Sequence, residues 1–480
     1  MKHSIFPLIL LLAACSSDPK STPMPVADIA VPAYPETRKD TAVTDRYFGT
    51  EVADPYRWLE NDTSEETGAW VKVQNEATYS YLDQLPDRER IKERLAEIWN
   101  YERYSTPYKK GPYYIFYKND GVQNQSVVYL QEGLEGTPRV LIDPNQFSED
   151  GTTALGTLSL SKDAKYAAYS VSVAGSDWQE IRVMEVATGK VLDDVIPWVK
   201  FSGISWFGDG FYYSRYDAPA GAEYSAKNEY HKVCYHQLGN DPAEDGIVFE
   251  DRDHPQRNFY AQTTEDEQYL IVYGAESTSG NALQFRNLTV EGSDWQVIDP
   301  KFEQEYRVID HVDGRFLLHT NHSAPKNRVV AVDPANPTAE NWTELIAEQE
   351  HVLEGITLAN GKMVSQYLVD VSNRLYVHDM DGKQEGEIAL PGLGIIGGFN
   401  ADKDSPTAFY SFTNYTTPGS IYRYDMATDS AVVFQQPNID FNPEDYETHQ
   451  VFFTSKDGTK VPMFITHKKG LKMDGNNPTF

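Results

Sequence analysis

Histidine and cysteine, the side chains most often used for metal binding or nucleophilic attack, are scarce in this 480-residue sequence, with 11 His and 2 Cys, whereas its 72 Asp and Glu are too many to single out a pair. His319 and His322 are close enough in sequence to suggest a metal pair, but at a strand end they would face differently, and no third ligand is evident. We interpret them as part of a turn and predict no metal and no cofactor. Cys234 lies in a strand-like run, which indicates a packed thiol rather than a reactive one. No Gly-rich phosphate-binding loop is present in the sequence.

The second cysteine, Cys15, ends a short apolar run and could be modified covalently. Leu12-Ala13-Ala14-Cys15 resembles a bacterial lipobox, in which the cysteine thiol is lipidated after cleavage. An ordinary secretory signal that happens to contain a cysteine is the alternative. We predict a signal peptide over 1–14, lipidation of Cys15 and a Ser/Pro-rich tether over 15–35. Ser16 favours a periplasmic protein anchored in the outer membrane of a bacterial cell envelope.

Composition narrows the possible partners. The net charge of −30 argues against nucleic acid, whose phosphates need a basic surface. Aromatic residues make up 12% of the chain, which suits a β-rich protein. With Cys15 acylated, Cys234 has no partner for an intrachain disulfide.

Two helices are predicted before the β-rich region. The first begins at Thr63, with Glu66 completing a capping box. Its apolar face carries Trp70, Val73 and Ala77. The second helix follows Pro86, and its apolar face carries Ile91, Leu95 and Ile98.

A repeated unit fills the sequence from 101 to 447. Each copy has a polar turn, an aromatic and β-branched strand, and a further alternating strand. Seven copies follow one another at intervals of 43 to 57 residues, with turns at Gly111, Lys165, Gly210, Glu267, Gly314, Gly361 and Asp404. Such units bury their faces by stacking around an axis. We therefore predict a mainly β fold with a seven-bladed β-propeller.

The pattern changes again in the last segment, 448–480. His449–Ser455 and Lys460–His467 alternate as strands, and Asp457-Gly458 between them is a hairpin signal. The sequence then ends at Phe480 in a strand-like approach, as if a domain began here.

Several of these segments resemble the prolyl oligopeptidase family of serine peptidases. The matching motifs lie in the same order along the chain, and the resemblance extends from Tyr34 to Phe480. They are Asp54–Glu60 (DPYRWLE), Gly175–Trp178 (GSDW), Lys200–Ser202 (KFS) and Ser455–Thr459 (SKDGT). The resemblance implies a propeller joined to an α/β-hydrolase domain, of which 36–100 and 448–480 would be incomplete parts.

The catalytic residues implied by this family are not found in the sequence. The family nucleophile lies in a Gly-x-Ser-x-Gly elbow, and no such motif occurs here. The implied Ser, Asp and His would all lie beyond Phe480, so we assign no catalytic residue in this chain. Phe201 corresponds to a family propeller residue that lines the substrate pocket, although an aromatic residue at this position would also suit a buried strand.

The resemblance implies an endopeptidase that cleaves after proline in short peptides, with the propeller excluding folded proteins. The printed chain would be the gating portion, inactive alone, and a monomer when the hydrolase domain is complete. One alternative is a non-catalytic, lipid-anchored propeller that binds peptides or a partner protein. Another is a separate chain that supplies the hydrolase part.

Overall fold

The computed structural model describes residues 29–219 and 227–479. The predicted signal peptide, Cys15 and the first part of the tether lie outside the described residues. The chain divides into two compact units, the first ending at Leu95 and the second beginning at Ala96. None of the described helices combines the length and the apolar character needed to cross a membrane.

The first unit contains a small hairpin and the first of the α-helices. The hairpin pairs β1 (Thr44–Tyr47) with β2 (Thr50–Ala53), and α1 spans Glu65–Leu82. The cap of α1 is Ser64, whose Oγ accepts the Thr67 amide at 3.1 Å. The predicted start at Thr63 is therefore wrong by one residue, because the Thr63 hydroxyl instead donates to Asn61 at 3.1 Å. The second predicted helix is confirmed as α2, Arg88–Trp99.

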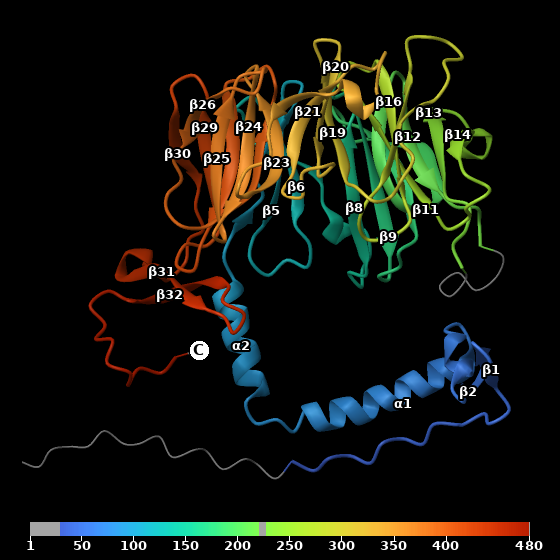
Figure 1. Ribbon diagram of the computed structural model, residues 1–480. Coiled ribbons are helices and arrows are strands. Elements are labelled where there is room, and N and C mark those ends of the chain that lie inside the picture. Colours follow the sequence, from blue (N-terminus) through green and yellow to red (C-terminus); the bar gives the residue numbers. More distant parts are fainter. Residues whose placement is uncertain (1–28, 220–226, 480) are drawn as a thin grey trace, which may run out of the picture. The chain divides into compact units, whose positions relative to one another are not determined.

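The second unit consists mainly of antiparallel sheets that stand side by side in chain order (Figure 1). The first sheet contains β3 (Arg103–Tyr104), β4 (Tyr108–Lys110), β5 (Tyr113–Asn119), β6 (Val127–Glu132) and β7 (Arg139–Ile142). The second contains β8 (Thr153–Leu160), β9 (Tyr166–Val173), β10 (Gln179–Glu185), β11 (Val191–Phe207), β12 (Gly210–Arg215), β13 (Lys232–Gln237) and β14 (Gly246–Glu250).

Four further sheets have four strands each. They are β15 (Asn258–Thr263) with β16 (Tyr269–Ala275), β17 (Ala282–Asn287) and β18 (Gln296–Asp299); β19 (Tyr306–Val312) with β20 (Arg315–Thr320), β21 (Arg328–Val332) and β22 (Thr343–Ile346); β23 (Val352–Ala359) with β24 (Lys362–Val369), β25 (Ser372–His378) and β26 (Gln384–Ile388); and β27 (Ile395–Ala401) with β28 (Thr407–Thr413), β29 (Ser420–Asp425) and β30 (Ser430–Gln435). Short 3-10 turns occur at Arg57–Glu60, Pro144–Gln146, Pro242–Glu244, Ala339–Asn341 and Pro443–Asp445.

The mainly β propeller is confirmed, but the prediction of seven blades is wrong. Five of the described sheets have the size of one blade, four with four strands and one with five. The repeat units at Lys165 and Gly210 instead share one continuous seven-stranded sheet, β8–β14. The physical reason is β11, a 17-residue strand that pairs with β10 along its first part and with β12 along its second.

The core lies between neighbouring sheets. Tyr269, Ile271 and Phe285 from one sheet pack on Phe316 and Val330 from the next. Both faces of a central strand are therefore buried, as in β9, where all positions from Ala167 to Val171 are buried. This two-sided burial explains the nearly continuous apolar runs in the sequence.

Side-chain contacts join the first and last sheets of the propeller. Tyr114 packs against Phe409 with ring centroids 5.8 Å apart, and Asn400 Nδ2 donates to the Thr106 carbonyl at 3.2 Å. In the described part of the chain, no strand of β3–β7 pairs with a strand of β27–β30. The ring is thus closed here by packing and polar side chains rather than by a backbone ladder.

A buried histidine lies between two carboxylates within the seven-stranded sheet. His236 Nε2 is 3.0 Å from Asp194, and Nδ1 is 2.9 Å from Asp245. The His236 side chain is fully buried, with Asp194 5% and Asp245 3% exposed. Burial alone opposes the charged form, but the hydrogen bonds to both carboxylates outweigh it and raise the pKa of His236.

The predicted C-terminal hairpin is confirmed. Strand β31 (Tyr446–Thr454) pairs with β32 (Lys460–Lys468), and Gly458 in the turn has φ +89°. Glycine adopts this left-handed conformation without the penalty of a Cβ. That this hairpin belongs to a hydrolase domain stays a prediction.

Candidate functional site

Two backbone irregularities in β11 position the predicted substrate-contacting residue. The pairing shifts register between Ile196 and Val199 on one side, and between Val199 and Ile204 on the other. At these bulges Trp198 has φ +61° and Phe201 has φ +53°, a left-handed conformation that costs energy for residues other than glycine. The second bulge interrupts the strand pairing at Phe201, and this residue is 44% exposed. The alternative of a buried core aromatic is therefore wrong.

Hydrogen bonds from neighbouring strands hold the bulge. Ser202 Oγ accepts the Ser214 amide at 2.7 Å, and His231 Nε2 is 3.0 Å from the Lys200 carbonyl. The other ring nitrogen, His231 Nδ1, accepts the Phe259 amide at 2.8 Å. Burial lowers the pKa of His231 to about 4, so its ring is neutral and donates through Nε2.

Lys200 lies between Phe201 and a cluster of three aromatic rings. Trp178 packs edge-to-face on Trp198 at 5.8 Å and on Tyr216 at 6.0 Å between centroids. Lys200 Nζ lies 5.1 Å from the Trp178 ring and 5.3 Å from the Phe201 ring. We call these four rings, Trp178, Trp198, Phe201 and Tyr216, the aromatic patch. Phe201, Trp178 and Trp198 are at least partly exposed and can offer flat apolar contacts to a ligand, whereas Tyr216 is 4% exposed and packs behind them only as support for Trp178. None of these rings is a nucleophile or a general base.

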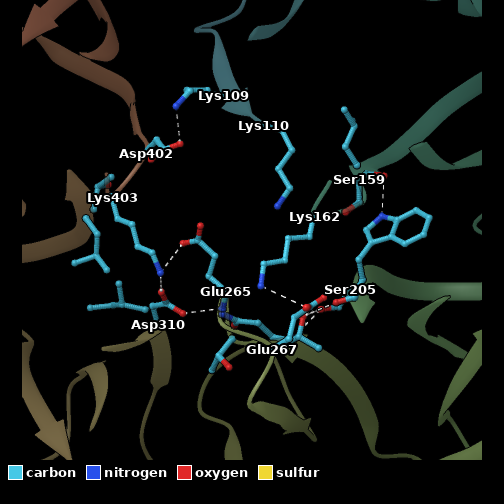
Figure 2. A pocket seen from close by; sticks show the side chains of 18 of the residues that line it. Lys109, Lys110, Ser159, Lys162, Ser205, Glu265, Glu267, Asp310, Asp402 and Lys403 are labelled. Atoms are coloured by element: carbon cyan, nitrogen blue, oxygen red, sulfur yellow. Dashed lines mark hydrogen bonds and ion pairs between the residues drawn. The ribbon is translucent and has the colours of Figure 1, made fainter. Parts of the chain in front are cut away.

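A second candidate feature is an open cavity of about 530 Å³ where the first strands of successive units converge. Strands β4, β8, β11, β15, β19, β23 and β27 all contribute to its lining. The side chains of Lys110, Lys162 and Lys403 extend into it (Figure 2). The cavity therefore has a polar wall to which all six described sheets of the propeller contribute.

Ion pairs between side chains of different sheets line this cavity (Figure 2). Lys403 Nζ lies 3.2 Å from both Asp310 and Glu265. The other two pairs are Lys109 with Asp402 at 3.1 Å and Lys162 with Glu267 at 3.3 Å. Burial opposes the charge of Lys403, but the attraction of Asp310 and Glu265 outweighs it and raises the pKa of that amine.

Two further cations of the lining are not paired in this way. Within residues 29–219 and 227–479, the side chains of Lys110 and Arg307 have no hydrogen-bond or ion-pair partner. Unpaired cations on a cavity wall can receive a carboxylate or carbonyl oxygen of a ligand. The lining residues include no histidine and so form no Ser-His-Asp constellation.

Comparison with known proteins identifies the family. Residues 35–437 match the family described as "Prolyl oligopeptidase, N-terminal beta-propeller domain". The chain belongs to the prolyl oligopeptidase family. Prolyl oligopeptidase relatives include the prolyl endopeptidase of Elizabethkingia meningoseptica, 44% identical over 448 residues. Another is the dual function macrocyclase-peptidase POPB of Amanita bisporigera, 32% identical over 495 residues.

Solved structures of this family have the same fold. A prolyl endopeptidase structure superposes with a TM-score of 0.84 at 32% identity, covering 93% of this chain and 66% of that one. The alignment with the Elizabethkingia meningoseptica prolyl endopeptidase covers 93% of this chain and 63% of the relative. For the Amanita relative the shares are 95% and 67%. The chain thus spans about two thirds of the length of these prolyl oligopeptidases.

The structure also gives the surroundings of His319, His322 and Cys234, the other residues considered in the sequence. His319 Nε2 contacts the Leu353 carbonyl at 3.0 Å, whereas His322 Nδ1 contacts the Tyr306 hydroxyl at 2.9 Å, so the two rings have different partners. Cys234 is buried as a packed thiol, and burial raises its pKa to about 11.

Sequence reasoning did not predict that Trp178 packs on Trp198 and Tyr216. One signal was available, because Trp178 belongs to the GSDW motif already recognised as typical of the prolyl oligopeptidase family. Trp198 and Tyr216 lack such a signal, since their approach depends on the bulges of β11 and its pairing with β12.

Proposed function

We propose that this chain is the propeller-bearing portion of a prolyl oligopeptidase-like serine peptidase that acts on short proline-containing peptides. Its family membership and the names of its relatives, prolyl endopeptidases, support this function. One relative of known structure was solved with a macrocyclization substrate bound. The propeller serves as a size filter, and the bond-breaking step is assigned to no residue of the printed sequence, which lacks a Gly-x-Ser-x-Gly motif.

The observation that carries the proposal is the exposed ring of Phe201. A non-glycine residue is kept in a left-handed backbone conformation, and its large apolar side chain is 44% exposed. Both features cost stability, and such strain is typical of positions that serve a ligand. In the proposal, the aromatic patch packs against the pyrrolidine ring or an adjacent apolar side chain of the peptide.

Peptide binding by the purified chain tests this role. A proline-containing peptide that binds the chain should bind the Phe201→Ala variant about 10-fold more weakly, since buried aromatic contacts dominate such interfaces. Val195→Ala is the matched control, because Val195 lies on the same strand and is 41% exposed. Equal affinities for the Phe201→Ala variant and the unmodified chain would exclude the aromatic patch as the peptide site.

Assays of the same preparation test the absence of catalytic residues. We expect no hydrolysis of a Gly-Pro-amide substrate and no labelling by a serine-directed probe. Activity that appears only when a second chain is added would indicate that another polypeptide supplies the nucleophile. Labelling of the purified chain itself would contradict the proposal that its propeller portion lacks catalytic residues.

We also propose that the mature protein is held in the outer membrane through a lipid on Cys15 and faces the periplasm. The sequence Leu12-Ala13-Ala14-Cys15 supports this localisation. Metabolic labelling with a fatty acid should mark the unmodified protein, and Cys15→Ser should abolish the label and release the protein into the soluble fraction. Undiminished labelling of the Cys15→Ser variant would exclude this anchor.

A further inference from the structure

Three side chains with metal-binding groups meet on the C-terminal hairpin. Glu447 and His449 lie on β31, and His467 lies on β32. The register places Glu447 directly opposite His467, and His449 follows two residues later on the same face of the strand. One ligand atom from each of the three residues lies within 4.8 Å of the other two.

The distances between these atoms suit one small ion. His449 Nε2 is 3.5 Å from one Glu447 carboxylate oxygen, and His467 Nδ1 is 3.6 Å from the other. Ligand atoms about 2.1 Å from a tetrahedral zinc ion stand about 3.4 Å apart. The side chains are thus spaced closely enough to share an ion with little rearrangement.

We propose that Glu447, His449 and His467 bind a divalent transition-metal ion of the zinc class. Two imidazoles and one carboxylate are preferred ligands of Zn²⁺ and of its neighbours Ni²⁺ and Cu²⁺, whereas Ca²⁺ and Mg²⁺ prefer oxygen alone. The formal charge of −30 also favours binding of a cation.

The hairpin prepares the site before any ion arrives. Nine residue pairs connect the two strands, from Tyr446 with Lys468 to Thr454 with Lys460. The His467 side chain is only 10% exposed, and its Nδ1 contacts the Lys468 carbonyl at 2.9 Å. The same nitrogen faces Glu447, so an ion bound at Nδ1 would take the place of the proton shared with Lys468, and the ring would keep its proton on Nε2.

The exposed side of the site is left open for a further ligand. The His449 side chain is 56% exposed, and Glu447 is 36% exposed. Three protein ligands leave at least one coordination position for water or for a group from a binding partner. A bound ion would also link β31 to β32 and so resist separation of the hairpin strands.

Metal titration of the tag-free, EDTA-treated chain tests the site. We expect one equivalent of Zn²⁺ by calorimetry, and one equivalent of Co²⁺ with the visible absorption of a low-coordinate complex. His449→Ala and Glu447→Gln should each weaken Zn²⁺ binding by more than about 10-fold, since even the loss of an outer-shell partner costs that much. Both residues are partly exposed, so their replacement should leave the circular dichroism spectrum unchanged.

His254→Ala is the matched control. His254 also lies on the surface beside a carboxylate, with Nδ1 2.9 Å from Asp251, but among the residues that the structure describes it belongs to no group of three ligands. Its replacement should leave the affinity and the stoichiometry unchanged. The proposal is overturned if Zn²⁺ binds only at millimolar concentration, or if His449→Ala and Glu447→Gln bind it as tightly as the unmodified chain.

Discussion

Replacing His236 with glutamine removes the cation between two buried carboxylates. The His236→Gln side chain is neutral and can donate to Asp194 or to Asp245, but not to both. Each lost hydrogen bond to a charged group is worth about 1.5–3 kcal/mol, and breaking a buried ion pair typically costs about 3–5 kcal/mol. The Tyr213 hydroxyl still donates to Asp245 at 2.8 Å, and the Gly239 amide still donates to Asp194 at 2.6 Å. We therefore expect a loss near the lower end, about 3 kcal/mol in the free energy of unfolding.

The pH dependence of this loss has a definite sign. The folded-state pKa of His236 is raised above the ordinary value of 6.5. Its stabilising contribution is therefore complete below pH 6.5 and declines as pH rises through the folded-state pKa. The difference between the unmodified chain and His236→Gln should be largest near pH 6 and smaller at pH 9.

Urea unfolding followed by tryptophan fluorescence at pH 6 and pH 9 measures both quantities. His254→Gln provides the control, because the His254 side chain is 53% exposed and its pair with Asp251 should contribute less than about 1 kcal/mol. A loss below about 1 kcal/mol for His236→Gln, or one of equal size at both pH values, would refute the assignment of a buried imidazolium.

Three other perturbations test separate parts of the structure. The pKa of His231 is lowered to about 4 in the folded chain, so as pH falls below 6.5 this imidazole is protonated in the unfolded chain before it is protonated in the folded one. The free energy of unfolding should therefore drop by about 3 kcal/mol between pH 6.5 and pH 4. His231→Gln should flatten this part of the stability profile measured by urea unfolding, and an unchanged slope would contradict the neutral buried ring. Lys403→Met should lower the free energy of unfolding by about 1–3 kcal/mol, because the Asp310 side chain, which is 7% exposed, loses its cation. Thermal unfolding measures this loss, and an unchanged unfolding temperature would show that the ion pair does not stabilise the fold. Gly382→Ala should lower the free energy of unfolding by more than about 1 kcal/mol, since φ is +89° and the new Cβ would lie 1.9 Å from a backbone oxygen. Gly203→Ala is the control in the same urea assay and should leave stability nearly unchanged, because no atom lies within 4 Å of its new Cβ.

Local patterns predicted most of the individual elements. The helix face of Ile91, Leu95 and Ile98 belongs to α2, and the strand signals around Asp457-Gly458 form β31 and β32. These elements are encoded by periodicity and turn residues within a short window of sequence.

The number of blades could not be predicted in the same way. Pro197 and Gly203 lie within the stretch from Val191 to Phe207 and suggest a boundary between two strands. The structure instead absorbs them in bulges of one strand, with Trp198 and Phe201 at positive φ. Whether a chain ends a sheet or continues through a bulge depends on its neighbours, which the local sequence does not contain.

The candidate sites also contain some residues that a local motif predicts and others whose contacts depend on the folded chain. Phe201 could be predicted because a short motif carries the family resemblance, but the packing of Trp178 on Trp198 and Tyr216 joins residues that only folding brings together. The group of Glu447, His449 and His467 was predictable in principle. Glu447 and His467 lie equally far from Asp457, so a hairpin centred there pairs them. Recognising the pair required counting along both strands from the turn.

The continuous β11 joins two repeat units of the propeller wall into one structural unit. An opening of either repeat unit must disturb a strand whose hydrogen bonds also belong to the other. Backbone amides from β8 to β14 should therefore exchange with solvent deuterium as a single slow block, whereas each of the four-stranded sheets can open on its own. Slow, concerted exchange would make this block the stiff part of the wall, against which the neighbouring sheets can move.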